Sequence, residues 1–233
     1  LSIGSSRYVW HQILDNPRIY NNSKNKSPYL GYTYTKNEVE KALENRKDEI
    51  DVLKVDDDYV IKTMIDKKII SVFGGGSESG RRALGNRSIL ADPRHSETKD
   101  IVNERVKHRQ WFRPFAPSVL RDYVKDWFVH DVDSPYMNVA MKFKSGMSKK
   151  VPAVVHFDDT ARLQTVSKED NEWYYNFIDT FRKETGVPIL LNTSFNDREP
   201  IVETPEHALD CFLRTNIDYL YFRNYGILVR KIK

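Results

Sequence analysis

The stretch from Val72 to Pro117 carries the residues best suited to chemistry, because glycine turns stand beside many cations. Three successive glycines, 74–76, follow an apolar run, and Gly80 and Gly85 come soon after. Glycine lets backbone N–H groups approach a ligand closely, and a concave row of such amides binds anions. Nine Arg and Lys residues share the stretch with five Asp and Glu residues. Because guanidinium groups bind phosphate bidentately, the pattern predicts a phosphate or nucleotide pocket; a basic, solvated surface is the alternative.

Four motifs within and beyond this stretch follow one another in a fixed order. They are Glu78-x-Gly80-x-Arg82-Ala83-Leu84-Gly85-Asn86-Arg87-Ser88, then Phe112-Arg113-Pro114-Phe115-Ala116-Pro117, then His156-Phe157-Asp158-Asp159-Thr160-Ala161-Arg162, then Leu191-Asn192-Thr193-Ser194-Phe195-Asn196. Together they resemble the O-carbamoyltransferases of the nodulation-protein U and cephalosporin type. The similarity covers roughly residues 60 to 225, and several motifs in order are far more specific than any one of them.

The resemblance implies a fold and an activity. It implies a YrdC-like domain of the α/β (α+β) class, in which helices cover the faces of a mixed, twisted open sheet. Such a domain would bind ATP, with Mg²⁺ carried by the nucleotide, and carbamoyl phosphate, and would form carbamoyl adenylate. An N-terminal actin-like domain of the same polypeptide, which alone would hold Fe²⁺, would then transfer the carbamoyl group to a substrate hydroxyl. We expect no metal held by this domain itself and leave a homodimer open.

The resemblance also assigns roles to individual residues. Catalytic roles fall on Arg82, Arg113 and His156. Binding of substrate or nucleotide falls on Gly80, Gly85, Arg87, Ser88, Lys107, Arg162, Asn192, Ser194 and Asn196. Read from the residues alone, the arginines could instead pair with Glu78 or Asp92, and the 192–196 segment could be a polar turn that bonds its own backbone.

The chain departs from the family pattern at a few positions. The family usually has arginine where Gly76 stands, proline where Arg81 stands and glycine where Asp159 stands, and segment 197–199 is one residue short. Two alternatives to the enzyme therefore stay open. One is a nucleotide- or RNA-binding YrdC-like module without catalysis, and the other is a structural remnant.

The whole chain sets broader limits. Its 233 residues, 39% hydrophobic, suffice for one large domain with an extension, and a net charge of +4 does not require nucleic acid as a partner. A single cysteine, Cys211, fits a reducing cytoplasm, and no apolar run approaches the ~20 residues that span a membrane. The first residue is not methionine. We expect residues 1–34 to be the tail of an N-terminal actin-like domain plus a linker, and residues 35–233 to be the YrdC-like domain.

Hydrophobic periodicity and capping residues predict the elements that must position these side chains. Helical spacing covers residues 1–14, and helices are expected over 35–49, after 56–58, over 96–108, 123–128 and 171–185, and from 204 onward. Strands are expected at 52–55, 68–73, 116–120, 139–143, 153–157, 162–166, 187–191, 218–222 and 227–229. The aspartates at 56–58 are expected to cap a helix, with a metal site as the alternative.

Overall fold

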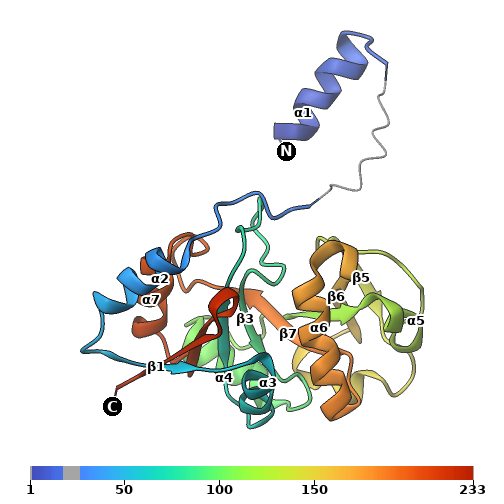
Figure 1. Ribbon diagram of the computed structural model, residues 1–233. Helices are drawn as coiled ribbons and strands as arrows, with labels where there is room; N and C mark the ends of the chain where they lie inside the picture. Colours follow the sequence, from blue (N-terminus) through green and yellow to red (C-terminus); the bar gives the residue numbers. More distant parts are fainter. Residues whose placement is uncertain (1, 18–26, 233) are drawn as a thin grey trace.

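A computed structural model describes residues 2–17 and 27–232. Its strands form one mixed sheet in the order β1-β9-β8-β2-β3-β7-β4-β6-β5 (Figure 1). The strands are β1 (Ile50–Lys54), β2 (Ile70–Phe73), β3 (Arg87–Ala91), β4 (Ala116–Leu120), β5 (Val139–Lys142), β6 (Thr160–Val166), β7 (Ile189–Ser194), β8 (Tyr219–Phe222) and β9 (Ile227–Lys231). Every residue of β2, β3 and β4 is buried, as expected for central strands. The expected mixed sheet with helices is confirmed.

Helices pack around this sheet in two main groups. In Figure 1, α2 lies beside α7 on one side, and α3 and α6 contact each other on the other. The helices are α1 (Ser2–Tyr8), α2 (Lys36–Glu44), α3 (Asp57–Ile65), α4 (Glu97–Ile101), α5 (Val124–Trp127), α6 (Lys168–Thr185) and α7 (Pro205–Arg214). Short 3₁₀ turns are η3 (Arg121–Tyr123), η4 (Ser148–Lys150), η5 (Pro152–Val154) and η6 (Arg223–Tyr225), and π-helical turns are η1 (Val9–Ile13) and η2 (Val102–Val106).

The expected caps set the ends of several helices. Thr35 and Glu38 form a reciprocal capping box at α2, and the Thr204 side chain accepts a hydrogen bond from the His207 amide at α7. Gly186 ends α6 in the left-handed conformation, with φ of 76°. The Asp56 side chain accepts a hydrogen bond from the Tyr59 amide, so the predicted aspartate cap of α3 is confirmed.

Three sequence expectations differ from the structure. Segment 153–157 is not a strand: residues 152–154 form a 3₁₀ turn, in which Pro152 has no N–H to give and the Ala153 amide bonds the Pro93 carbonyl. Residues 87–91 form the central strand β3, which was not expected. The helix expected over 96–108 changes from α-helix to π-helix at Val102. Residues 2–13 are helical, which agrees with the prediction for the described part of 1–14, but the large apolar side chains from Tyr8 to Leu14 are exposed.

The strand register brings several chain segments to one end of the sheet. Phe73 at the end of β2 lies opposite Arg87 at the start of β3, and Ser194 at the end of β7 lies opposite Ser88. Strand β4 runs antiparallel to β7, which ends here, and parallel to β6. Strands β4 and β6 therefore both begin at this same end. We call it the site end. Nearly all of the residues with predicted roles lie on it or in the loops that leave it.

Candidate functional site

Five arginines converge at the site end of the sheet. Two come from the loop between β2 and β3, two from the segment before β4, and one from the start of β6. We call them the arginine cluster: Arg81, Arg82, Arg109, Arg113 and Arg162. Because β3, β7, β4 and β6 are consecutive neighbours in the sheet, loops far apart in sequence meet here.

The charges of the cluster act on one another unfavourably. Burial, followed by the charges of Arg113 and Arg162, lowers the pKa of Arg109 to about 10. Burial, followed by the charges of Arg82 and Arg81, lowers the pKa of Arg162. Like charges held this close disfavour each other's protonated form. The five arginines therefore form a region of concentrated positive potential.

No acidic side chain neutralises this potential in the part of the chain that the structure describes. None of the ion pairs formed there includes a cluster arginine. The side chain of Arg109 bonds only neutral oxygens, Asn103 Oδ1 at 2.7 Å and the Pro114 carbonyl at 3.5 Å, and its guanidinium lies 4.5 Å from the Phe115 ring centroid. The Nε of Arg162 is buried without a hydrogen-bond partner. An unpaired buried donor of this kind marks a place for an acceptor.

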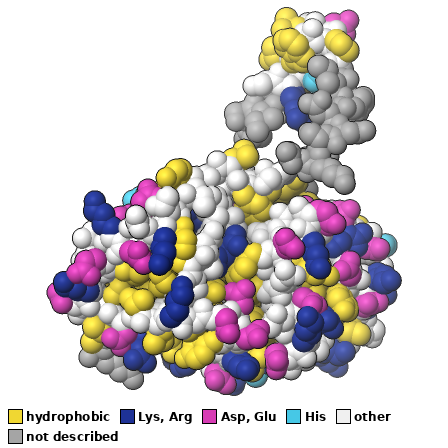
Figure 2. All heavy atoms as spheres, in the orientation of Figure 1, with side chains coloured by type: hydrophobic (Ala, Val, Ile, Leu, Met, Phe, Trp, Pro, Cys, Tyr) yellow, Lys and Arg dark blue, Asp and Glu magenta, His cyan; other side chains and the backbone are white. Residues whose placement is uncertain are grey.

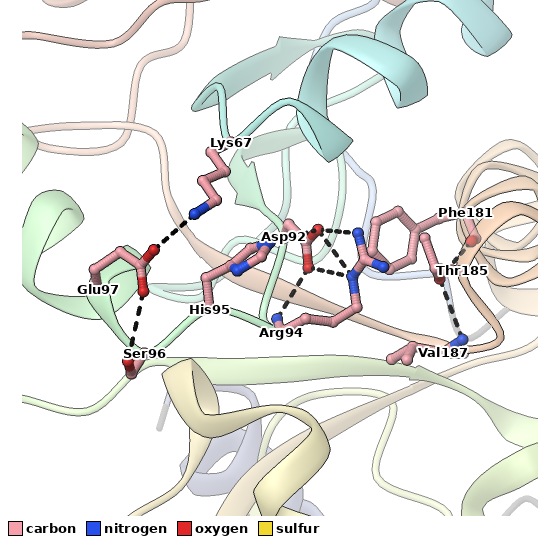
Figure 3. A network of polar contacts seen from close by, with 9 residues as sticks. All are labelled: Lys67, Asp92, Arg94, His95, Ser96, Glu97, Phe181, Thr185 and Val187. Atoms are coloured by element: carbon pink, nitrogen blue, oxygen red, sulfur yellow. Dashed lines mark hydrogen bonds and ion pairs between the residues drawn. The ribbon is translucent and has the colours of Figure 1, made fainter.

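The two acids suggested as structural partners of these arginines are engaged elsewhere. Asp92 is 1% exposed and receives three hydrogen bonds of 2.6 to 3.0 Å from the Arg94 guanidinium (Figure 3). The Glu78 Oε1 accepts the amides of Leu84, Asn86 and Arg87 at 2.7, 2.8 and 3.3 Å. Glu78 thus folds the loop around its own carboxylate and leaves Arg82 free of it.

A buried polar network under the loop holds its backbone in place. We call residues Ser77–Leu84 the arginine loop. The Asn192 Nδ2 donates to the Ala83 carbonyl at 3.1 Å, and the Gln164 Nε2 donates to the Leu84 carbonyl at 2.9 Å. Asn192 and Gln164 also bond each other and the Ser118 hydroxyl. Buried side chains of strands β4, β6 and β7 therefore hold the backbone next to Arg82 in place.

The predicted residues fall into groups. Arg82, Arg113 and Arg162 come together in the cluster. His156 lies at its border, where burial, opposed by Asp158 and reinforced by Arg162, lowers its pKa. Its Nδ1 lies 3.0 Å from the Thr160 hydroxyl.

Lys107, Ser194 and Asn196 form a second group at the end of β7. The Lys107 Nζ bonds the carbonyl and hydroxyl of Ser194 at 2.5 and 3.2 Å, and the carbonyl and Oδ1 of Asn196 at 2.7 and 2.8 Å. Burial, followed by the charge of Arg109, lowers the pKa of Lys107 to about 7. Lysine here ties the β7 end to the segment that carries Arg109.

Arg87, Ser88 and Asn192 are placed inside the protein rather than toward the cluster. Arg87 is 0% exposed, its Nη1 donates to three backbone carbonyls, and its guanidinium stacks 3.7 Å from the Phe73 ring centroid. Its Nε and Nη2, like the Arg162 Nε, are buried without a hydrogen-bond partner. The Ser88 hydroxyl accepts the Gly85 amide at 2.9 Å. These contacts give the three residues positions in the scaffold of the loop.

The two glycines with predicted roles differ. Gly85 has φ of 117°, and a Cβ there would lie 2.5 Å from the Tyr174 ring, so both backbone and space require glycine. Gly80 has nothing within 4 Å of an added Cβ and lies at the exposed tip of the loop.

Two departures from the family pattern have local explanations. A Cβ on Gly76 would lie 2.4 Å from the Gly31 carbonyl, so the arginine usual in the family does not fit here while Gly31 keeps its place. Asp159 has φ of 62°, which is the left-handed region that favours glycine. His108, directly before Arg109, has φ of 44°. Left-handed residues other than glycine store strain and gather at functional sites.

Two members of the cluster, Arg109 and Arg81, do not stand out as site residues in the sequence. Arg109 is one of nine basic residues in the 72–117 stretch and directly follows the helix expected over 96–108, where a cation also complements the helix dipole. Arg81 was noted only because the family has proline there. The density of arginines in this stretch is the sequence signal that identifies both. In the structure, no described acid forms an ion pair with either of them.

The site carries side chains of the kind that bind phosphate oxygens. The unpaired guanidinium groups and the orphaned Arg162 Nε suit phosphate oxygens. Among the described residues no group of three or more His, Cys, Asp or Glu side chains is arranged for a metal ion. The prediction that this domain holds no metal stays a prediction. None of the described helices combines the length and apolarity needed to cross a bilayer.

Comparison with known proteins supports the family assignment. A nodulation protein, NolNO of Sinorhizobium fredii, is 47% identical over 169 residues, which are 71% of this chain and 25% of that protein. An uncharacterized protein of Methanocaldococcus jannaschii is 41% identical over 211 residues, or 88% of this chain and 34% of that protein. The crystal structure of HypF from T. kodakarensis shares the fold, with a TM-score of 0.51 and 15% identity over 79% of this chain and 23% of that one.

The chain thus spans about a quarter to a third of the length of these two relatives. The family model described as carbamoyltransferase C-terminus matches residues 61–230, a range that contains the whole arginine cluster and the polar network beneath it. This protein therefore belongs to the carbamoyltransferase family and is similar to its C-terminal region.

Proposed function

We propose that this domain binds ATP and carbamoyl phosphate in the arginine cluster and forms carbamoyl adenylate. The observation that supports it most is the set of five arginines without an acidic partner among the described residues. Two polyanions that bind side by side need a dense, preorganised positive potential. Unpaired arginines supply this potential, because no ion pair within the protein has to break before they bind phosphate.

The chemistry joins a carbamate oxygen to the α-phosphorus of ATP. Water first hydrolyses carbamoyl phosphate to carbamate and inorganic phosphate. A carbamate oxygen then attacks the α-phosphorus as the bond from that phosphorus to pyrophosphate breaks. The negative charge of the attacking carbamate is replaced by that of the leaving pyrophosphate, and the phosphoryl oxygens are charged as well, so catalysis is mainly positioning and charge stabilisation. In this proposal Arg82, Arg113 and Arg162 hold phosphates, and His156 lies where it could exchange a proton at Nε2.

Other residues support the same site from behind. Lys107, Ser194 and Asn196 fix the end of β7, and Arg87, Ser88 and Asn192 fix the loop. Mg²⁺ would arrive with ATP and be held mainly by phosphate oxygens. We propose that another part of a longer polypeptide, an actin-like domain that holds Fe²⁺, passes the carbamoyl group to a hydroxyl acceptor, and that residues 1–34 lead from it into this domain.

Exchange of labelled pyrophosphate into ATP tests the reaction, because adenylation is reversible and needs no hydroxyl acceptor. We expect exchange only in the presence of carbamoyl phosphate. Replacing Arg82 or Arg162 with alanine should weaken ATP binding about tenfold or more, since each charge-assisted bond contributes roughly 1.5–3 kcal/mol. Arg230→Ala is the matched control, because Arg230 lies on β9, four strands away from β7 in the sheet, and pairs there with Asp51 of β1.

Other outcomes would contradict the proposal in different ways. Exchange without carbamoyl phosphate would mean that another acid is adenylated. ATP binding without any exchange would favour a nucleotide-binding module. RNA binding that falls steeply with salt would favour the nucleic-acid alternative, although acidic and basic side chains are interspersed on the face seen in Figure 2.

A further inference from the structure

A short segment ahead of the domain packs directly on the arginine loop. We call residues Pro28–Gly31 the strap. The Gly31 amide donates to the Ser77 carbonyl at 3.1 Å, and the Ser79 amide donates to the Pro28 carbonyl at 2.7 Å. These two backbone bonds join the strap to the loop, although the two segments are some fifty residues apart in sequence.

Glycine makes this close approach feasible on both sides. A Cβ on Gly31 would lie 1.9 Å from the Ser77 hydroxyl oxygen and 2.6 Å from its amide nitrogen. A Cβ on Gly76 would lie 2.4 Å from the Gly31 carbonyl oxygen and 3.1 Å from the Tyr29 carbonyl oxygen. Contacts this short are not sustained by real side chains, so the strap requires glycine at both positions.

Tyr29 carries the contact to the far end of the loop. Its hydroxyl donates a 2.9 Å hydrogen bond to the Leu84 carbonyl, and its ring packs on Leu84, Ala116 and Met137. The same carbonyl accepts the Gln164 Nε2 at 2.9 Å, so both acceptor positions of Leu84 are filled. The amide of Leu84 donates to Glu78 Oε1. The backbone amide and carbonyl of Leu84, two residues after Arg82, are therefore both hydrogen-bonded.

We propose that Tyr29 is a positioning residue of the arginine cluster, and that the strap is part of the site rather than of a linker. Tyr29 acts through the Leu84 carbonyl on the backbone that carries Arg81 and Arg82. The role as part of an anion site rests on the proposed function, but the hold on the loop does not.

Tyr29→Phe removes the hydroxyl and keeps the ring. One lost hydrogen bond should speed hydrogen exchange of the Leu84 and Asn86 amides about threefold to tenfold, and weaken binding of inorganic pyrophosphate by a similar factor. The melting temperature and exchange in β8 and β9 should change little, which separates positioning from a general loss of stability. Tyr32→Phe is the matched control, because the Tyr32 hydroxyl reaches only Glu38, at 3.5 Å.

Gly31→Ala gives an independent second variant. Its Cβ should push the strap off Ser77 and reproduce both effects with Tyr29 intact. Unchanged exchange in the arginine loop of both variants, with tight pyrophosphate binding in the wild type, would overturn the positioning role and leave the proposed function standing. Faster loop exchange in a protein whose wild type binds no pyrophosphate would overturn the proposed function and keep the hold of Tyr29 on the loop.

Discussion

Two sets of arginines in this molecule are treated in opposite ways. Arg94 gives its guanidinium to the buried Asp92 and lies 5.5 Å from the Phe181 ring centroid (Figure 3), and Arg182 pairs with Asp179. The arginines of the cluster form no ion pair with an acid among the residues that the structure describes. In the first set the charge fastens the chain to itself. In the second set the positive charges stay free to bind an anion, and the arginines repel one another while no anion is bound.

Breaking the Asp92–Arg94 pair should give the largest effect on stability. Asp92→Ala should lower the free energy of unfolding by about 2–3 kcal/mol, because a buried carboxylate that receives several hydrogen bonds is lost and Arg94 keeps only partial solvent contact. Urea denaturation measures it. Asp51→Ala, which removes an exposed partner of Arg230, should cost less than about 1 kcal/mol; equal losses would show that burial does not distinguish the two pairs.

Lys107 tests an intermediate case, a buried cation whose hydrogen-bond acceptors are all uncharged. Lys107→Met should lower the free energy of unfolding by about 2 kcal/mol through the lost hydrogen bonds. Because burial lowers the folded pKa from 10.5 to about 7, the unfolded chain binds more protons between these values. Wild-type stability should therefore rise with pH across that window. Denaturation at pH 7 and pH 9 should show this rise in the wild type and not in Lys107→Met; parallel curves would contradict it.

Removing one charge from the cluster should act in the opposite direction and by the smallest amount. Without added anions, Arg162→Gln should raise the free energy of unfolding by about 0.5–1 kcal/mol, since repulsion is relieved. Millimolar pyrophosphate should raise the melting temperature of the wild type, because it binds only the folded state, and should do so far less in the variant. Arg230→Gln should keep the full anion response. A loss of stability in Arg162→Gln would mean that this arginine has a structural partner.

The sequence allowed most of the fold to be predicted, since periodicity and caps mark the helices and most strands. Strand β3 was missed because its apolar residues, Ile89, Leu90 and Ala91, directly follow a motif rich in Gly and Arg that resembles a loop. The strand expected at 153–157 was wrong because alternation of apolar residues does not reveal that Pro152 and a bond from Ala153 to Pro93 turn the chain. Tertiary contacts decided both cases.

The site could be predicted as a region but not residue by residue. Arg82 and Arg87 stand in one motif five positions apart, yet one joins the cluster and the other lies in the core against Phe73. Only the strand register, which puts Arg87 opposite Phe73, separates them. Tyr29 could not be found at all, because it lies in a segment rich in turn formers, and its partner Leu84 is distant in sequence.

The pairing of β1 with β9 has a consequence for how such a unit is carried in a longer polypeptide. Ile50 lies opposite Lys231 and Lys54 opposite Ile227, so the strands that come first and last along the chain are neighbours over their whole length. The Ile232 amide even bonds the Glu49 carbonyl, just before β1. The last strand of the chain therefore holds the first strand in the sheet, and a module boundary drawn between β8 and β9 would leave β1 at the sheet margin without its partner strand.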